Sequence, residues 1–587
     1  MCRASKCGRP GDGGCLVLPR QPIIIGCVRF NRKSKPMDRL IAANYMLNTR
    51  RGRIFIENLT AYIFLAPAGC LILLFGLFPV AFAFFVSLHR WRRFPDEYVG
   101  LANYEKALGN LGYILFFWLA LIGCAATLML SRRLLRRLRE TKLDGQAAAL
   151  LAGIVSGYAV LLAIDWFFKL IPVIMLIPRQ VRGRNTSLAL FMEKFGESFL
   201  SPGVYEAGSL LIVGLLAAIV IVSVVLRRLG AGVGGEVIVL SAIVTALLLA
   251  SVFLLRLTIH ETELAIAEAR GAGESLPIWS QLVFISAGIA LIAGAYVIFQ
   301  RGIKALENRR FALLSLSGLS LAVGGYLLMA EAPAALTAGD DDLLQGFWVT
   351  IMYASGTVPV QLTIGLLLAY LLFQPIRFRA FFRMVYFIPY ITPFVATSIV
   401  FRIIFDAGQY APANRMLTLV GIEPQRWILE RTTLGNLLGL PDFLAGPALA
   451  LVVIMIYSTW TYIGYDAVIF LAGLGNIPGE LYEAARIDGA SGWRIFRHIT
   501  LPLLSPTVFF LSLVAIIGTF QAFTQIWILR TGAVGNKVNT ASVYIFDELQ
   551  NSNRYGYASS MAFVLFALIL LLTLFQNRIM GRRVFYG

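Results

Sequence analysis

Charged side chains are scarce in this sequence. Asp, Glu, Lys and Arg make up only 14% of the 587 residues, whereas 58% are hydrophobic. A water-soluble globule of this size cannot bury so much apolar surface. Apolar runs long enough to cross a bilayer recur along the chain. The composition therefore excludes a soluble globular domain and predicts an all-α polytopic membrane protein with roughly twelve transmembrane helices.

Motifs that carry catalytic chemistry are also missing. There is no GxxxxGK[ST] phosphate-binding loop, no HExxH metal motif and no GxSxG nucleophile elbow. The histidines number only three and are dispersed, as His89, His260 and His498. The six cysteines have neither metal-ligand nor disulfide spacing. We expect no catalytic residue, no metal site and no cofactor held by this chain.

Acidic residues are outnumbered, which leaves a net charge of +19. The Lys and Arg residues stand in short clusters beside apolar runs, which is typical of cytoplasmic loops and argues against nucleic-acid binding. Basic clusters precede the first run and follow the last, so both termini are predicted to be cytoplasmic. They comprise Arg50, Arg51, Arg53, Arg578, Arg582 and Arg583.

The apolar runs divide the chain into four predicted segments. Residues 1–60 form a cytoplasmic N-terminal segment without the order of a signal peptide, and Met37 is a plausible alternative translation start. Residues 61–108 hold the first core helix and an external segment. Residues 109–343 hold about six further runs, with 165–206 as their largest external connection. Residues 344–587 hold five more core helices.

One polar stretch, residues 480–506, separates two strongly apolar segments. Its first part predicts a short helix over residues 481–487, because Glu480 and Glu483 would lie in the first turn, where carboxylates favour the positive end of the helix dipole. Gly489 then accepts the left-handed backbone that a helix end often needs. The sequence thus predicts a helix and a tight turn at the membrane surface.

The second part of the stretch predicts another helix over residues 493–499. Ser491 can cap it, and Pro502 is expected to end it. A helix, turn and helix rimmed by both charges suits insertion into a groove on a partner protein.

These residues carry a resemblance to a known family. The order Glu483-Ala484-Ala485, Gly489 and then Ile499-Thr500-Leu501-Pro502 resembles the EAA loop of binding-protein-dependent ABC importer permeases. The fuller wording EAARIDGASGWRIFRHITLPLL is similar to carbohydrate permeases of the MalF type. In that family the loop docks into the ATPase subunit. The resemblance implies this coupling role for Glu480, Glu483, Ala484, Ala485, Asp488, Gly489, Ile499, Leu501 and Pro502.

The resemblance continues almost without interruption from residue 347 onward, and residues 98–108 are similar to the external segment that follows the first helix of these permeases. The helical insertion at 109–343 departs from the family pattern. Residues 406–446 resemble the surface that faces the solute-binding protein. The resemblance implies a dimer of ABC ATPase subunits that uses ATP and Mg, a second, MalG-like permease subunit, an extracytoplasmic solute-binding protein, a sugar substrate and surrounding lipid in a bacterial inner membrane.

A sugar pathway needs uncharged polar groups for hydroxyls and aromatic planes for ring faces. Two predicted spans provide them in the segments YSTWTYIGYD and GTFQAFTQ. The family positions imply a lining role for Thr461, Tyr462, Tyr465, Ala515, Gly518, Thr519 and Ala522, to which we add Gln521 and Gln525 on their chemistry. Tyr and Thr can also simply join helices. Asp466 is either functional or paired with a basic residue of a neighbouring subunit.

The favoured interpretation is the permease subunit of an ABC importer for a neutral mono-, di- or oligosaccharide. Glycerol phosphate or a polyol is the alternative solute, and a phosphate would call for Arg or Lys in the pathway. An ATP-independent secondary transporter also has about twelve spans, but such proteins usually show repeated halves. A membrane-embedded enzyme would need clustered His, Asp or Glu, which the sequence lacks.

Overall fold

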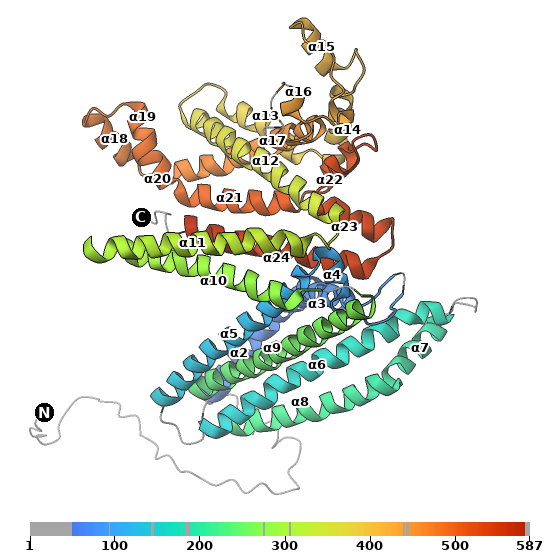
Figure 1. The fold of residues 1–587 in the computed structure, drawn as a ribbon. Coiled ribbons are helices and arrows are strands. Elements are labelled where there is room, and N and C mark those ends of the chain that lie inside the picture. Colours follow the sequence, from blue (N-terminus) through green and yellow to red (C-terminus); the bar gives the residue numbers. More distant parts are fainter. Residues whose placement is uncertain are drawn as a thin grey trace, which may run out of the picture. The chain divides into compact units, whose positions relative to one another are not determined.

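The computed structural model describes residues 50–581, apart from residues 93, 142–145, 182–187, 230, 274–275, 305–306, 438, 440 and 442–444. Throughout this part of the chain the regular elements are helices, and β-pairing is limited to isolated bridges between His89 and Tyr98 and between Thr433 and Ala448. The all-α prediction is confirmed (Figure 1). Most of the predicted N-terminal segment, including Met37, lies outside the described residues.

Ten helices of the described chain are long and apolar enough to cross a membrane. They are Ile63–Ser87, Leu111–Arg139, Gln146–Val181, Pro202–Leu226, Gly234–Gly271, Ile278–Ile303, Arg309–Leu336, Asp341–Phe373, Leu449–Gly475 and Tyr555–Met580. Two bent pairs raise the number to 12 if each is one span: Arg379–Ile391 with Phe394–Ile404, bent by 95°, and Gly492–Leu503 with Ser505–Phe520, bent by 64°. This agrees with the prediction of roughly twelve spans.

The chain divides into two units, residues 1–79 and 80–587. The described part of the first unit holds α2 (Arg50–Leu71) and a short π-helix, η1 (Ile72–Leu77). The second unit begins within α3 (Phe78–Ser87) and holds all the remaining elements.

The inserted region is built from seven helices after α4 (Ala102–Leu108). They are α5 (Leu111–Thr141), α6 (Gln146–Val181), α7 (Leu188–Leu200), α8 (Pro202–Leu229), α9 (Ala231–Gly271), α10 (Ile278–Ile303) and α11 (Glu307–Leu336). Helix α9 packs against α5 and α6, α6 packs against α8, and α10 pairs with α11 (Figure 1). Small residues permit the close approach of α10 and α11, since a Cβ at Gly324 would stand 2.8 Å from the Gly288 carbonyl oxygen.

Helix α6 is longer than the sequence suggests. Residues 165–206 were expected to form an external connection, but α6 continues to Val181 and α7 occupies Leu188–Leu200. Leu170, Ile171 and Ile177 are buried in the last part of α6, and α6 as a whole packs against α7, α8 and α9. This packing stabilises a helix that two internal prolines would otherwise weaken. The sequence did not predict this helical structure, and the external position of residues 165–206 stays a prediction.

The two ends of the insertion meet at one point of the core. A Cβ at Gly109 would stand 2.4 Å from the Ala335 carbonyl oxygen, so only glycine fits there. Asp340 holds this junction: its carboxylate accepts hydrogen bonds from the Tyr557 hydroxyl at 2.5 Å and the Tyr544 hydroxyl at 2.9 Å. Burial, and next the bond to the Asp340 carboxylate, raise the pKa of Tyr544 well above its usual range. The inserted helices therefore leave and rejoin the core at the same place.

The permease core comprises the α-helices that follow this junction, to which the short helices within residues 479–503 are attached. They are α12 (Asp341–Phe373), α13 (Arg379–Ile391), α14 (Phe394–Ile404), α15 (Pro412–Leu419), α16 (Leu434–Leu437), α17 (Leu449–Gly475), α21 (Ser505–Phe520), α22 (Thr524–Leu529), α23 (Ala541–Gln550) and α24 (Tyr555–Met580). Helix α12 lies along α17, and α13 also packs on α17. Their shared core includes the fully buried Tyr353, Ile454 and Tyr457. This arrangement positions the candidate site.

Candidate functional site

The predicted coupling loop is a compact helical segment between α17 and α21. It consists of α18 (Gly479–Ile487), α19 (Gly492–Ile495), a π-helical turn, η4 (Phe496–Thr500), and α20 (Leu501–Leu503). The expected order of helix, turn and helix is present. Figure 1 shows α18 and α19 at the tip of this segment.

The turn between α18 and α19 is built on Gly489, whose φ is +72°. The Ala490 amide donates to the Ala485 carbonyl at 2.9 Å, and the Gly489 amide donates to the Arg486 carbonyl at 3.1 Å. This pair of bonds is the Schellman motif, which satisfies the last carbonyls of a helix. A Cβ at residue 489 would meet no atom within 4 Å, so the backbone angle alone favours glycine.

The second half of the loop differs from expectation in two details. Ser491 precedes α19, but its side chain makes no capping hydrogen bond. Pro502 lies within α20, and the bend of 64° falls at Leu504 instead. Pro502 occupies the first turn of α20, where a missing amide costs little, and the wider turn η4 precedes it. The prediction that Pro502 ends the helix is therefore wrong.

Aromatic contacts tie the loop to the end of α12. The Tyr370 and Phe496 rings pack edge to face with centroids 5.2 Å apart, and Phe373 lies 6.5 Å from Tyr482. The Tyr482 hydroxyl also lies 3.3 Å from the Thr500 hydroxyl, which joins the two halves of the loop. A displacement of the loop would therefore be transmitted to α12 as well as to α17 and α21.

Most residues assigned to coupling are accessible. The exposed ones are Glu480, Glu483, Ala484, Asp488, Gly489, Leu501 and Pro502, whereas Ile499 is half-buried and Ala485 is buried. Two apolar side chains that the sequence analysis did not assign to coupling stand out: Ile487 is 86% exposed and Trp493 is 69% exposed. They give the loop an apolar tip with a charged rim, which suits a groove on a partner.

The predicted pathway residues of α17 differ in how exposed their side chains are. Thr461 is fully buried, and its hydroxyl donates to the Tyr457 carbonyl at 2.9 Å. Tyr462 and Tyr465 are half-buried, and both contact Tyr390 of α13. The Tyr390 and Tyr465 rings stack at 4.7 Å, while Tyr462 meets Tyr390 at 5.9 Å and 61°. The Thr461 hydroxyl is thus satisfied within α17 itself, whereas the tyrosines form an aromatic cluster with α13.

Tyr390 is a candidate that the sequence analysis missed. It lies in the last turn of α13, between Pro389 and Pro393, just before the chain bends by 95° into α14. Each proline lacks a backbone amide, so neither can complete the helical hydrogen-bond pattern across the bend. The available signal was the tyrosine between them, but its position beside α17 depends on how α13 packs.

The pathway residues predicted in the next span also include both exposed and buried residues. Gly518 and Gln521 are exposed and Ala515 is half-buried, whereas Thr519, Ala522 and Gln525 are buried. The Thr519 hydroxyl donates to the Ala515 carbonyl at 2.9 Å, and Gln525 donates to the Tyr353 hydroxyl at 3.3 Å. The span is interrupted between α21 and α22, around Ala522. Thr519 and Gln525 therefore have structural partners in this conformation.

Asp466 faces the interior of this chain. Its side chain is 2% exposed, and a Cβ at Gly365 of α12 would stand 2.8 Å from the Asp466 Cβ. The Asp466 Oδ2 atom has no hydrogen-bond partner, and neither do the Thr357 hydroxyl and the Gln361 carbonyl oxygen on the same side of α12. Of the alternatives for Asp466, pairing with a neighbouring subunit does not fit this burial.

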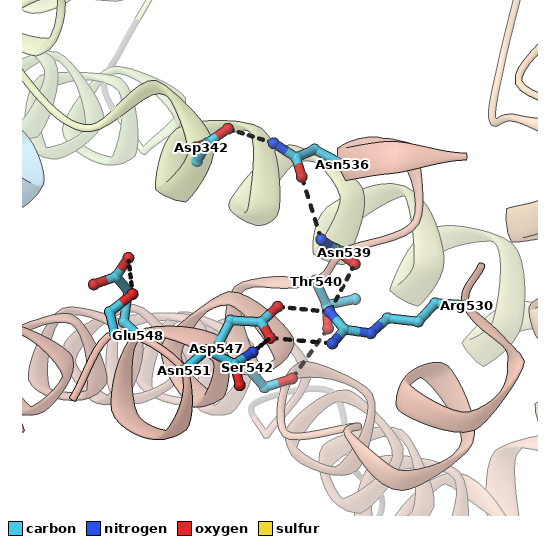
Figure 2. Close-up of polar contacts among 10 residues, drawn as sticks. Asp342, Arg530, Asn536, Asn539, Thr540, Ser542, Asp547, Glu548 and Asn551 are labelled. Carbon is cyan, nitrogen blue, oxygen red and sulfur yellow. Dashed lines mark hydrogen bonds and ion pairs between the residues drawn. The ribbon is translucent and has the colours of Figure 1, made fainter. Parts of the chain in front are cut away.

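A polar network stabilises the opposite end of the core (Figure 2). Arg530 pairs with Asp547 through two hydrogen bonds of 2.6 and 3.1 Å and stacks over Trp527 at 3.6 Å. Asn539 lies 3.5 Å from Arg530 and donates to Asn536, which in turn donates to Asp342 at the start of α12. This network joins α12, the segment after α22, and α23.

The fold defines a class of protein: a helical, multi-pass membrane component with a short helical loop between two core helices. The family described as "Binding-protein-dependent transport system inner membrane component" matches residues 361–586. The arabinooligosaccharide permease protein AraP of Bacillus subtilis is 32% identical over 236 residues, which cover 40% of this chain and 70% of AraP. The lactose permease protein LacF of Rhizobium radiobacter is 29% identical over 302 residues, 50% of this chain and 91% of LacF.

This chain belongs to that family of ABC importer permeases and is a multi-pass inner-membrane protein. The osmoprotective compounds permease protein GgtC of Synechocystis is 29% identical and covers 39% of this chain and 77% of its own length. A bacterial alginate ABC transporter aligns with a TM-score of 0.37 at 19% identity, covering 41% of this chain and 80% of that one. The chain is a transport subunit and not an enzyme.

Proposed function

We propose that this permease carries a neutral sugar and that residues 479–503 couple its movement to a dimer of ATPase subunits. The observation that supports a sugar is the aromatic cluster of Tyr390, Tyr462 and Tyr465. Aromatic planes stack on sugar ring faces, and phenol hydroxyls exchange hydrogen bonds with sugar hydroxyls. Helices α17 and α21 carry no Lys or Arg, which argues against a phosphorylated solute.

The proposed mechanism follows the family resemblance. A solute-binding protein delivers the sugar from outside, and this chain pairs with a second permease subunit. ATP and Mg bind in the partner ATPase, whose closure moves the coupling loops. Within this chain, α18 and α19, joined by the Gly489 turn, would move as one body and pull α12 through the contact between Tyr370 and Phe496. Hydrolysis resets the cycle, and both termini are cytoplasmic in this arrangement.

The ATPase rate of the intact complex tests which solute is carried, and sugar uptake by Tyr465 variants tests the aromatic cluster. The intact complex is purified from native membranes, and its ATPase rate is measured with binding protein loaded with arabino-oligosaccharide, lactose or glycerol phosphate. Stimulation by a neutral saccharide is expected. Tyr465→Ala should raise the sugar concentration needed for half-maximal uptake about tenfold, whereas Tyr465→Phe keeps the stacking ring and should stay within about threefold. Stimulation by glycerol phosphate alone would contradict the choice of solute.

A second candidate is an osmoprotective solute such as a polyol. The similarity to GgtC supports it. The same aromatic cluster can accommodate small polyhydroxylated molecules, so the choice depends on the measured uptake. Competition of a polyol against radiolabelled oligosaccharide separates the two: strong competition by the polyol would favour the osmoprotective solute.

A further inference from the structure

A basic and aromatic surface begins four residues after α12 and extends into α13. Its guanidinium groups come from Arg377, Arg379 and Arg383, and no Asp or Glu occurs between residues 343 and 405. Arg377 and Arg383 are exposed. In the described part of the chain none of the three arginines takes part in an ion pair. The surface is therefore strongly positive without internal compensation.

Two of the arginines lie near the N-terminus of α13, where positive charge is unfavourable. Arg379 and Arg383 occupy the start of α13, where the helix dipole is positive, and the helix has no acidic residue in its first turn and no side-chain cap. The first amides of a helix lack intrahelical acceptors. In addition, the Arg379 Nε atom is buried and has no hydrogen-bond partner. These groups are donors or positive charges, and an anion beside the start of α13 would be electrostatically favourable.

Large apolar side chains accompany the charges. Phe378 is 77% exposed, Phe381 is 55% exposed and Ile376 is 40% exposed. Phe378 also adopts a left-handed backbone with φ +61°, which is costly for a bulky residue. A free phosphate needs no such neighbours, whereas the headgroup region of a membrane accepts aromatic rings beside basic side chains. The pattern thus favours an anion that is attached to acyl chains.

The surface lies on the coupling-loop side of the core. The end of α12 contacts the loop through Tyr370 and Phe373. Arg377 is the fourth residue after Phe373. The other end of α13 carries Tyr390 of the aromatic cluster. Whatever binds the start of α13 therefore restrains a helix that borders the pathway.

We propose that Arg377, Arg379 and Arg383, with Phe378 and Phe381, bind the phosphate headgroup of an anionic phospholipid and anchor the start of α13 at the membrane surface. The guanidinium groups pair with the phosphate, which they can do bidentately, and the rings enter the interface. The proposed function is needed only to say which leaflet of the membrane holds this lipid. The binding itself does not depend on transport.

The test measures lipid directly on the complete complex. Wild type and an Arg377→Gln, Arg379→Gln, Arg383→Gln variant are placed in nanodiscs of phosphatidylcholine with phosphatidylglycerol, extracted gently, and assayed for retained phosphatidylglycerol by native mass spectrometry. Three arginines beside a membrane phosphate correspond to a loss of retained lipid on the order of 100-fold. The matched control neutralises Arg301, Lys304 and Arg309 of the insertion, which are also exposed basic residues, and should retain lipid as wild type does.

A further variant guards against misfolding. Phe378→Gly relieves the left-handed backbone, so the protein should fold at least as well while it loses the ring, and retained lipid should fall several-fold. Equal losses in the control variant would show a general effect of surface charge and overturn the site. Full displacement by inorganic phosphate would assign the site to free phosphate and overturn the lipid. Because the readout is bound lipid, a failed transport assay leaves this result intact.

Discussion

Gly365 of α12 lies directly against Asp466 of α17: a Cβ on residue 365 would stand 2.8 Å from the Asp466 Cβ. Real Cβ atoms do not approach so closely, so the two helices would have to separate. We expect Gly365→Ala to lower the free energy of unfolding by about 1–3 kcal/mol through overpacking. Thermal unfolding in detergent checks this. Gly325→Ala is the matched control, because its Cβ would meet no atom within 4 Å; equal melting temperatures for the two variants would contradict the close packing.

The Gly489 turn should tolerate residues according to their backbone preference. Since φ is +72° and space is open, Gly489→Asn should retain most of the substrate-stimulated ATPase rate, whereas Gly489→Val should lose it. The strain for Ala is about 1–2 kcal/mol, so Gly489→Ala should be intermediate. Gly492→Ala, which also has open space and no positive φ, serves as the control. The turn would have no role if Gly489→Val coupled normally.

Arg530 and Asp547 should be energetically coupled, because they form two hydrogen bonds and are only 21% and 24% exposed. A double-mutant cycle with Arg530→Gln and Asp547→Asn should give a coupling energy of about 1–3 kcal/mol in thermal unfolding. The exposed pair Lys169 and Asp165 should give less than about 1 kcal/mol by the same measurement. If the two substitutions had additive effects, the Arg530–Asp547 pair of the network in Figure 2 would contribute no coupling energy to the stability of the core.

His89 should make stability depend on pH. Burial lowers its pKa below the usual value, although the bond between its Nδ1 and the Phe85 carbonyl at 2.8 Å opposes this. The folded state therefore binds the proton less readily than the unfolded state does. This contribution to stability is present above about pH 6.5 and is lost as the pH falls. The melting temperature of wild type should decline more steeply below pH 6.5 than that of His89→Gln; parallel curves would contradict the burial effect.

Local chemistry explains what the sequence could predict. The left-handed turn at Gly489 depends on a few neighbouring residues, so Asp488-Gly489 was sufficient to predict it. Long apolar runs likewise predicted nearly every span. The assigned roles of the coupling and pathway residues stay predictions, since accessibility and packing do not measure function. The boundaries of the predicted segments also stay a prediction.

Tertiary packing explains what the sequence could not predict. Tyr390 reaches α17 because Gly464 lets α13 approach so closely that a Cβ there would collide with the Tyr386 carbonyl. No periodicity in either helix signals that contact. The extension of α6 and the burial of Asp466 likewise depend on neighbouring helices, which supply partners and exclude solvent.

The central claim is that this chain passes a sugar only when a partner hydrolyses ATP. The most direct measurement is uptake of radiolabelled oligosaccharide into proteoliposomes that contain the complex, with ATP and Mg trapped inside and binding protein outside. Uptake should require all three and should fall to background in a Glu483→Ala, Gly489→Val variant that still inserts into the membrane. Uptake by this chain alone, without ATP or an ATPase subunit, would contradict the account and identify a secondary transporter.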